Sequence, residues 1–250
     1  MTAVLALHDV SFSIGGAQLT SDVSFDVQPG ERLALVGPNG AGKTTLMNLI
    51  SGIFRPTAGR IVLGDHDVTA WSIQHRARAG LARTFQITNL LPSRTVAENL
   101  AIAVGARHRQ RGNPLLSWRR LGTVWTRVDE LIEQAGLGAV RDMCVGELAY
   151  GEQRKLEIVV AVARPARVVL LDEPGAGLTL DEAHALLDLV IAVGQDVAII
   201  FIDHDLELIR RLATDVVLLD QGCVVARGAP TSVLESEQFR MAYLEGDIRA

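Results

Sequence analysis

The chain has 250 residues, with 24 Lys and Arg against 29 Asp and Glu, so its formal net charge is −5. This length suits one large domain or two small ones. An acidic balance is not typical of nucleic-acid-binding proteins, which usually carry a basic surface, so we expect no nucleic-acid partner. The longest apolar runs, such as residues 197–202, are far shorter than the roughly 20 residues that a membrane-spanning helix needs.

Three further features bear on the compartment. The start of the chain, residues 1–9, lacks the basic region and cleavage site of a signal peptide. Cys144 and Cys223 lie far apart, which indicates two reduced and mostly buried thiols of a cytosolic protein rather than a metal site. The arginine-rich residues 107–111 and 119–120 interrupt the acidic balance. They indicate either a solvated face or a surface that meets a membrane partner or lipid headgroups.

The N-terminal part of the chain reads as strands. Residues 5–12 and 23–27 alternate between apolar and polar side chains, which predicts antiparallel strands. Gly15–Gly16 and residues 28–31 are typical turns between such strands. Residues 32–36 form a third apolar strand, residues 44–50 a helix, and residues 61–63 another short strand.

The middle of the chain changes character between about residues 90 and 163. Val128, Leu131, Ile132 and Ala135 have helical spacing, and the glycines at 136 and 138 are suited to end that helix. Apolar strands then return at residues 168–171, 197–202, 216–219 and 224–226. Continuous apolar runs of this kind are typical of strands covered by helices on both faces, so we expect an α/β nucleotide-binding core interrupted by a helical insert.

The strongest chemical motif lies between the strand at 32–36 and the helix at 44–50. It is a complete phosphate-binding loop (P-loop) made of Gly37, Pro38, Asn39, Gly40, Ala41, Gly42, Lys43, Thr44 and Thr45. Its glycines allow backbone N–H groups to turn towards phosphate oxygens, and the following helix adds its positive N-terminal end. Lys43 can reach the outer phosphates and the Thr44 hydroxyl can bind Mg²⁺.

An acidic pair follows the apolar strand at residues 168–171. Asp172 is placed to lie beside a phosphate-bound Mg²⁺, as an indirect or water-mediated ligand. Glu173 can polarise a water for in-line attack on the γ-phosphate. Together with the P-loop, the pair predicts nucleoside triphosphate hydrolysis.

The segment Leu148–Arg154 completes an order of motifs that resembles the ATP-binding cassette (ABC) ATPases over nearly the whole chain. The resemblance implies the ABC ATPase fold: a P-loop NTPase (RecA-like) core with an N-terminal antiparallel β subdomain and an α-helical insert. It also implies ATP and Mg²⁺ as cofactors. The expected boundaries are a core of about residues 1–86 and 164–235, an insert of about 87–163 and a short C-terminal helix at 236–250.

The same resemblance assigns further site residues. In this family the Leu-Ser-Gly-Gly-Gln element binds the γ-phosphate held by a second subunit, and the matching positions here include Tyr150, Gly151 and Glu152. Gln86 matches the glutamine that contacts Mg²⁺ and the attacking water. His204 matches the histidine that senses the γ-phosphate and steadies the water activated by Glu173.

The adenine position departs from the family pattern. The family usually stacks adenine on an aromatic residue before a turn near the N-terminus, and the corresponding residue here is Ile14. Phe12 lies two residues earlier on the same strand. Either Ile14 supports adenine through apolar contact alone, or Phe12 serves instead.

Other variations are similar to the ATPase subunits of branched-chain amino acid importers, especially residues 83–86, 95–100, 148–154 and 242–246. Importers of urea and amides share this pattern, and the lipopolysaccharide-export ATPases are related. The resemblance implies a dimer with a second copy or a paralogue, integral membrane permease subunits and an extracytoplasmic solute-binding protein. Its place would be peripheral, on the cytoplasmic face of the membrane. The alternatives are a soluble ABC ATPase that acts on DNA or ribosomes, and a binding module without hydrolysis.

Overall fold

The computed structural model of the chain describes residues 2–84, 90–105, 122–163, 166–176, 180–193 and 196–248. It divides into two compact units. The first unit comprises Met1–Arg83, Ala166–Ala176 and Asp196–Ala250, and the second comprises Thr84–Pro165 and Gly177–Gln195. The second unit therefore includes residues 177–195, which the sequence analysis assigned to the core. The arginine-rich residues 107–111 and 119–120 lie outside the described residues.

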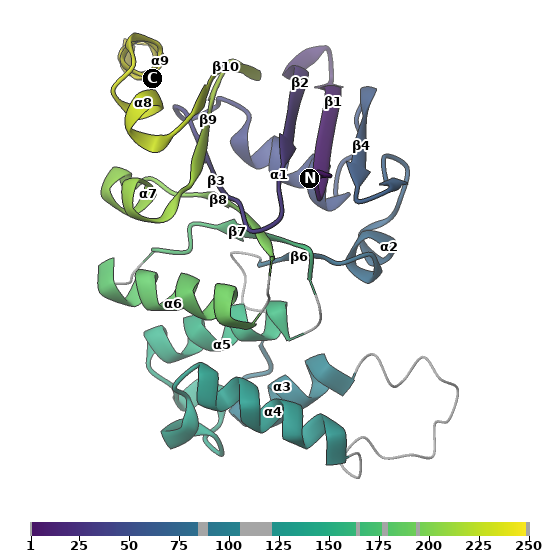
Figure 1. Cartoon of the computed structure of the whole chain (residues 1–250), viewed down its shortest axis with the longest axis vertical. Coiled ribbons are helices and arrows are strands. Elements are labelled where there is room, and N and C mark those ends of the chain that lie inside the picture. Colours follow the sequence, from purple (N-terminus) through teal and green to yellow (C-terminus); the bar gives the residue numbers. More distant parts are fainter. Residues whose placement is uncertain are drawn as a thin grey trace. The chain divides into compact units, whose positions relative to one another are not determined.

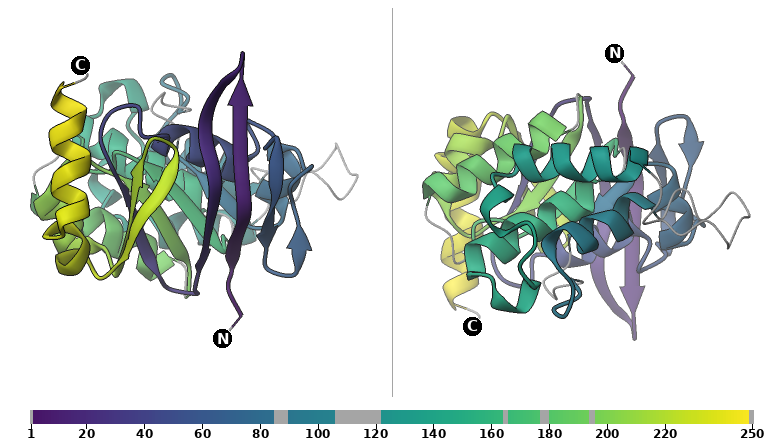
Figure 2. Two further views of the ribbon diagram at one scale, coloured as in Figure 1. Left: turned by 90° about the horizontal axis from the view of Figure 1, so that it is seen from above. Right: turned by 90° about the horizontal axis from the view of Figure 1, so that it is seen from below.

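The first unit contains two sheets (Figure 1). The four-stranded sheet has the order β2-β1-β4-β5 and is formed by β1 (Leu5–Ile14), β2 (Ala17–Val27), β4 (Ala58–Leu63) and β5 (His66–Asp67). The strands β1 and β2 are antiparallel neighbours, with Leu5 opposite Val27 and Ile14 opposite Ala17 (Figure 2). This pairing confirms the two N-terminal strands and the turn predicted at Gly15–Gly16.

The six-stranded sheet of the first unit has the order β10-β9-β3-β8-β7-β6. Its strands are β3 (Arg32–Val36), β6 (Leu81–Arg83), β7 (Val168–Asp172), β8 (Ala198–Ile202), β9 (Asp215–Asp220) and β10 (Cys223–Gly228). Pairing is parallel from β9 through β3, β8 and β7 to β6. All five residues of β8 are buried, which agrees with the continuous apolar run read from the sequence.

The last strand of this sheet differs from the expectation. Strand β10 pairs antiparallel with β9, and its residues alternate between exposed and partly buried positions. Cys223 is exposed and Cys144 is only partly buried, so the prediction of two mostly buried thiols was wrong. The physical reason is that Cys223 begins an edge strand, where one row of side chains faces solvent.

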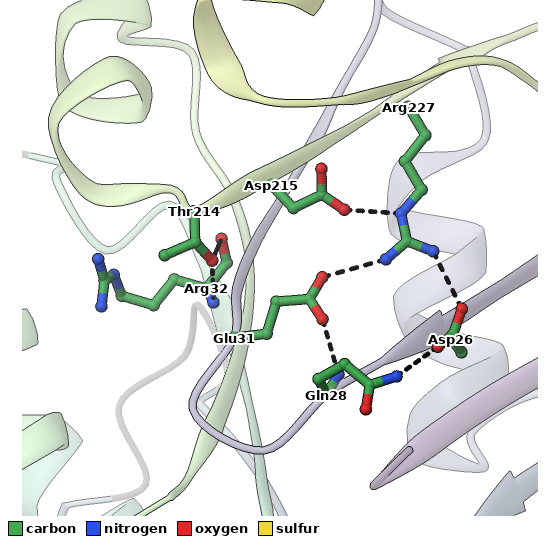
Figure 3. A network of polar contacts seen from close by, with 7 residues as sticks. All are labelled: Asp26, Gln28, Glu31, Arg32, Thr214, Asp215 and Arg227. Atoms are coloured by element: carbon green, nitrogen blue, oxygen red, sulfur yellow. Dashed lines mark hydrogen bonds and ion pairs between the residues drawn. The ribbon is translucent and has the colours of Figure 1, made fainter. Parts of the chain in front are cut away.

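The first unit also carries α1 (Lys43–Ser51), α2 (Ile73–Arg78), α7 (Leu206–Leu212), α8 (Pro230–Leu234) and α9 (Glu237–Ile248). A polar network ties its two sheets together (Figure 3). Arg227 of β10 donates to Asp215 of β9 at 2.7 Å, to Asp26 of β2 at 3.3 Å and to Glu31 at 3.2 Å. Burial raises the pKa of Glu31, and the charge of Arg227 opposes that rise. The guanidinium therefore joins strands from both sheets.

The second unit is helical among its described residues, with the helices in teal and green in Figure 2 (right). It contains α3 (Val96–Gly105), α4 (Gly122–Gln134), α5 (Tyr150–Val162) and α6 (Leu180–Val193), with short 3₁₀ turns at Gly138–Val140 and Val145–Glu147. Helix α3 packs against α4 and α5, and α6 packs against the same two helices. The predicted apolar face of α4 is confirmed, because Val128, Leu131 and Ile132 are buried. No helix in the described ranges is long and apolar enough to cross a lipid bilayer.

Candidate functional site

The P-loop runs from the end of β3 to the first residue of α1, and its shape depends on glycine. Gly37 and Gly42 have φ values of +146° and +98°, a region that favours glycine. A Cβ atom on Gly37 would lie 2.1 Å from the carbonyl oxygen of Leu219, and one on Gly42 would lie 2.7 Å from that of Leu19. Both positions therefore require glycine for conformation and for space.

Lys43 lies inside this loop. It is 8% exposed, and its Nζ donates to the carbonyl oxygens of Gly37 at 2.5 Å and Pro38 at 2.8 Å. Burial lowers the pKa of Lys43, and the nearby negative charge of Glu173 partly opposes that shift. The ammonium group is thus held among loop carbonyls, at a place where phosphate oxygens would be stronger partners.

Glu173 follows β7 and pairs with His204. Its N–H donates to the carbonyl oxygen of Ile202 at 2.9 Å, and its Oε1 lies 2.9 Å from Nε2 of His204. An ionised carboxylate only accepts hydrogen bonds, so Nε2–H donates to it. Glu173 has φ +48°, a conformation that is uncommon outside glycine and tends to occur at functional sites. The structure therefore brings two predicted catalytic side chains together in the first unit.

Asp203 organises the turn that carries His204, a role not predicted from the sequence. Its Oδ1 accepts the N–H groups of His204 at 2.8 Å and Asp205 at 3.0 Å, and its Oδ2 accepts that of Gly175 at 3.1 Å. Asp205 in turn caps α7 by accepting the N–H groups of Glu207 and Leu208. Since Gly175 lies two residues after Glu173, Asp203 fixes the loops on both sides of the Glu173–His204 pair. The only sequence signal was its place in the polar run after a buried strand.

Arg83 is a second residue near the site that sequence reasoning did not assign a role. Its Nε and Nη2 both donate to Oδ2 of Asp172, at 3.2 and 2.8 Å, and the two side chains are 6% and 12% exposed. Its Nη1 donates to Asn48 Oδ1 and Ser51 Oγ of α1, each at 2.8 Å. Arg83 therefore links the predicted Asp172 to the helix that begins with Lys43.

The far end of α1 is closed by Arg76, a fully buried arginine. Its Nη1 donates to the carbonyl oxygens of Leu49 at 2.6 Å and Ile50 at 2.7 Å, in the last turn of the helix. Burial lowers the pKa of Arg76 to about 10. The positive group stabilises the negative end of the helix dipole, at the end of α1 away from the P-loop.

The oxygen donors near the P-loop fit the way in which proteins hold Mg²⁺. Thr44 is exposed in the first turn of α1, and Asp172 ends β7. Among the residues that the structure describes, no group of three or more His, Cys, Asp or Glu could hold a metal. This sparse set suits Mg²⁺, which usually keeps several waters and is bound by one or two protein groups plus substrate phosphates.

The remaining predicted residues fall in different places. Phe12 is 8% exposed and stacks on Phe54 with a centroid distance of 5.1 Å, whereas Ile14 is 60% exposed. Of the two alternatives for adenine, only Ile14 therefore presents its side chain to solvent, because Phe12 is committed to the core. Gln86 lies in residues 85–89, outside the described part of the chain.

In the second unit, Tyr150, Gly151 and Glu152 form the first turn of α5, and Tyr150 is 58% exposed. The Glu152 carboxylate accepts the N–H of Ala149 at 3.0 Å. This bond occupies the carboxylate at the helix start, where a glutamine stands in the related family element. The backbone N–H groups of this first turn point out of the helix end, as they do in any α-helix.

The family model for ABC transporters matches residues 20–176. The high-affinity branched-chain amino acid transport ATP-binding protein LivG of Escherichia coli (strain K12) is 32% identical over 96% of this chain and 97% of that protein. BraF of Pseudomonas aeruginosa, with the same description, is 30% identical over the same shares. The ribose import ATP-binding protein RbsA 1 of Rhizobium meliloti is 34% identical, but this chain spans only 47% of it.

Solved structures agree on the fold. A nucleotide-free ATP-binding cassette of an ABC transporter superposes with a TM-score of 0.84, at 24% identity over 97% of this chain and 99% of that one. The ADP conformation of an ATP-binding cassette superposes with a TM-score of 0.82, at 24% identity over 98% and 99%. These likenesses confirm the predicted fold class. From its family match, its P-loop and its full-length relatives, the chain belongs to the ABC transporter family, as one of its ATP-binding, ATP-hydrolysing subunits.

Proposed function

We propose that this chain is the ATPase subunit of an importer of branched-chain amino acids or of a related small polar solute such as urea or an amide. The LivG and BraF matches span almost the full length of both chains, which supports this class. The ribose-import relative has slightly higher identity over half its own length, so identity alone does not select the cargo. We assign cargo specificity to the other subunits. The fold of the ATPase subunit does not identify the cargo, because function depends on a specific binding site rather than on the fold.

The observation that carries the proposed chemistry is the 2.9 Å hydrogen bond between Glu173 and His204, in the same unit as the P-loop. Glu173 accepts a proton from the attacking water. The Nε2–H of His204 orients the carboxylate in this structure, and with ATP bound it would donate instead towards charge that develops on the γ-phosphate. The Lys43 ammonium group, which the carbonyls of Gly37 and Pro38 hold at the loop, binds the outer phosphates. Gln86, by its match to the family pattern, would contact the same water and the metal.

Thr44 and Asp172 would hold Mg²⁺ beside the phosphates, with Asp172 acting through water. Mg²⁺, when bound together with ATP, neutralises charge on the β- and γ-phosphate oxygens. The pairing of Asp172 with Arg83 keeps the carboxylate at the end of β7 and ready for that contact. Ile14 supports adenine by apolar contact.

A second copy of this chain or a paralogue completes the site. The first turn of α5, with Tyr150, Gly151 and Glu152, presents N–H groups to the γ-phosphate bound by the other subunit. ATP then favours the closed dimer by bridging the two chains, and hydrolysis removes that bridge. The segment with Leu90, Leu91 and Arg94 receives a helix of the permease on the cytoplasmic face of the membrane. Leu91 and Arg94 are exposed there, whereas Leu90 is buried and would not meet the permease helix. An extracytoplasmic binding protein delivers the solute.

The nucleotide part of this proposal is tested by comparing the chain's two lysines. We expect Lys43→Ala to lose most of its ATP affinity in titration calorimetry, because phosphate contacts are lost. Lys155→Ala, a partly buried residue of α5, should bind ATP within about twofold of wild type, because Lys155 is not one of the proposed phosphate-binding residues. Equal affinity of the wild type and Lys43→Ala would refute the proposed phosphate site.

The cargo is tested by co-expressing the chain with the permease subunits encoded beside it and reconstituting the complex in liposomes. ATP-dependent uptake of leucine, isoleucine or valine supports the amino acid importer, and uptake of urea or an amide supports the related class. Co-purification of nucleic acid without membrane subunits, or export of a lipid, would contradict the importer.

A further inference from the structure

The C-terminal helix α9 contacts the start of the P-loop. The buried N–H of Gly37 donates to the hydroxyl oxygen of Tyr243 at 3.2 Å, across 206 positions of sequence. The ring of Tyr243 packs on Phe239, one turn earlier in α9, with a centroid distance of 4.4 Å. Burial raises the pKa of Tyr243, so its hydroxyl is neutral at physiological pH and accepts the bond from Gly37.

Gly37 joins this contact to Lys43. Its N–H is held by Tyr243, and its carbonyl oxygen accepts Nζ of Lys43 at 2.5 Å. The backbone at Gly37 is closely packed on one side, since a Cβ atom there would lie 2.1 Å from the carbonyl oxygen of Leu219. A shift of the Gly37 N–H therefore moves the carbonyl that holds the Lys43 ammonium group.

We propose that Tyr243 is a positioning residue of the ATP site. Its hydroxyl holds the Gly37 N–H and so keeps the first turn of the P-loop and Lys43 in the conformation that receives phosphate. Loss of the bond between Tyr243 and Gly37 then lowers ATP affinity. Because such coupling is reciprocal, ATP binding strengthens the docking of α9 by the same factor. The inference rests on nucleotide binding by the P-loop.

The direct test is Tyr243→Phe, which removes one oxygen and keeps the ring on Phe239. The change leaves the Gly37 N–H without the Tyr243 hydroxyl as its acceptor. This loss should raise the Kd for ATP about 3- to 10-fold. We expect KM for ATP to rise by a similar factor while kcat changes less than twofold, since Tyr243 does not touch the reacting atoms.

A matched control separates positioning from simple stability. Ser236 caps α9 by accepting the N–H of Phe239 at 3.1 Å, and it does not contact Gly37. Ser236→Ala should lower the midpoint of thermal unfolding at least as much as Tyr243→Phe, because loss of such a cap costs helix stability. It should leave the Kd for ATP within about twofold of wild type, because it keeps the Tyr243 hydroxyl that holds the Gly37 N–H.

Hydrogen exchange supplies a second readout. ATP should slow amide exchange of residues 237–243 in the wild type and in Ser236→Ala, but not in Tyr243→Phe. An ATP affinity of Tyr243→Phe within twofold of wild type would overturn the inference, as would equal losses of affinity in Tyr243→Phe and Ser236→Ala. The Lys43→Ala variant separates a failure of this inference from a failure of the proposed function. It tests phosphate binding directly and leaves the sequence of α9 unchanged.

Discussion

Replacing Arg83 with methionine tests how strongly its ion pair with Asp172 stabilises the first unit. Methionine keeps an unbranched apolar stem but removes at least four hydrogen bonds: two to Asp172 Oδ2, one to Asn48 and one to Ser51. Both members of the pair are nearly buried, at 6% and 12% side-chain exposure, so solvent replaces little of what is lost.

The expected magnitude follows from that burial. Removing one member of a buried ion pair costs about 3–5 kcal/mol, because the other charge is left in a poorly solvated place. Asp172 has other interactions in this structure, so we expect the lower end of that range. For a protein of this size, about 3 kcal/mol corresponds to a fall of roughly 6–12 °C in the midpoint of thermal unfolding.

The assay is thermal unfolding followed by circular dichroism, with Arg78→Met as the control. Arg78 is exposed on α2, five residues from Arg83, and its loss should change stability by less than about 0.5 kcal/mol. The double variant Arg83→Met with Asp172→Asn should be more stable than the sum of the two single changes predicts. A midpoint for Arg83→Met within 2 °C of Arg78→Met, or strictly additive losses, would refute the reasoning.

Three further predictions concern the site and its surroundings. Burial lowers the pKa of Lys43 and bound phosphate would raise it again, so ATP binding at alkaline pH should take up protons and weaken as the pH rises. Calorimetry at pH 9 in buffers of different ionisation enthalpy measures this uptake, and finding none would contradict the prediction. Arg227→Gln should lower the free energy of unfolding by about 1–3 kcal/mol in urea titrations, because Glu31 is left partly buried without its cation. This range already allows for the partial exposure of the pair. Wild-type stability of the variant would count against the network. Gly151→Asp should abolish ATP-dependent dimerisation in gel filtration, since the new carboxylate would repel the γ-phosphate bound by the partner subunit. The monomer should keep its ATP affinity, and an intact dimer would argue against the proposed role of α5.

Local features of the fold were predictable because their signals are local. The P-loop lies between a strand and a helix as expected, and β7, β8 and β9 are buried where continuous apolar runs predicted them. Strand β10 was harder, since a short apolar run does not reveal whether a strand is central and parallel or an antiparallel edge. Its alternating exposure appears only once its pairing with β9 is known.

Contacts between distant parts of the chain could not be predicted in the same way. Arg83 and Asp172 are 89 positions apart, and Gly37 and Tyr243 are 206 apart, so no periodicity links them. Asp203 stands in a polar run whose members are equivalent in sequence, and only the turn geometry selects it to accept three N–H groups. The strand pattern also could not show which of Phe12 and Ile14 is exposed, because the burial of Phe12 depends on its stacking on Phe54.

The most direct test of the account is a single-turnover measurement of ATP hydrolysis by Glu173→Gln. Glutamine keeps the size of the side chain and a hydrogen-bond acceptor for His204, but it cannot take a proton from water. The account predicts a rate about 10²- to 10⁴-fold below wild type, the usual contribution of a general base, with ATP affinity preserved. Hydrolysis at the wild-type rate would contradict it.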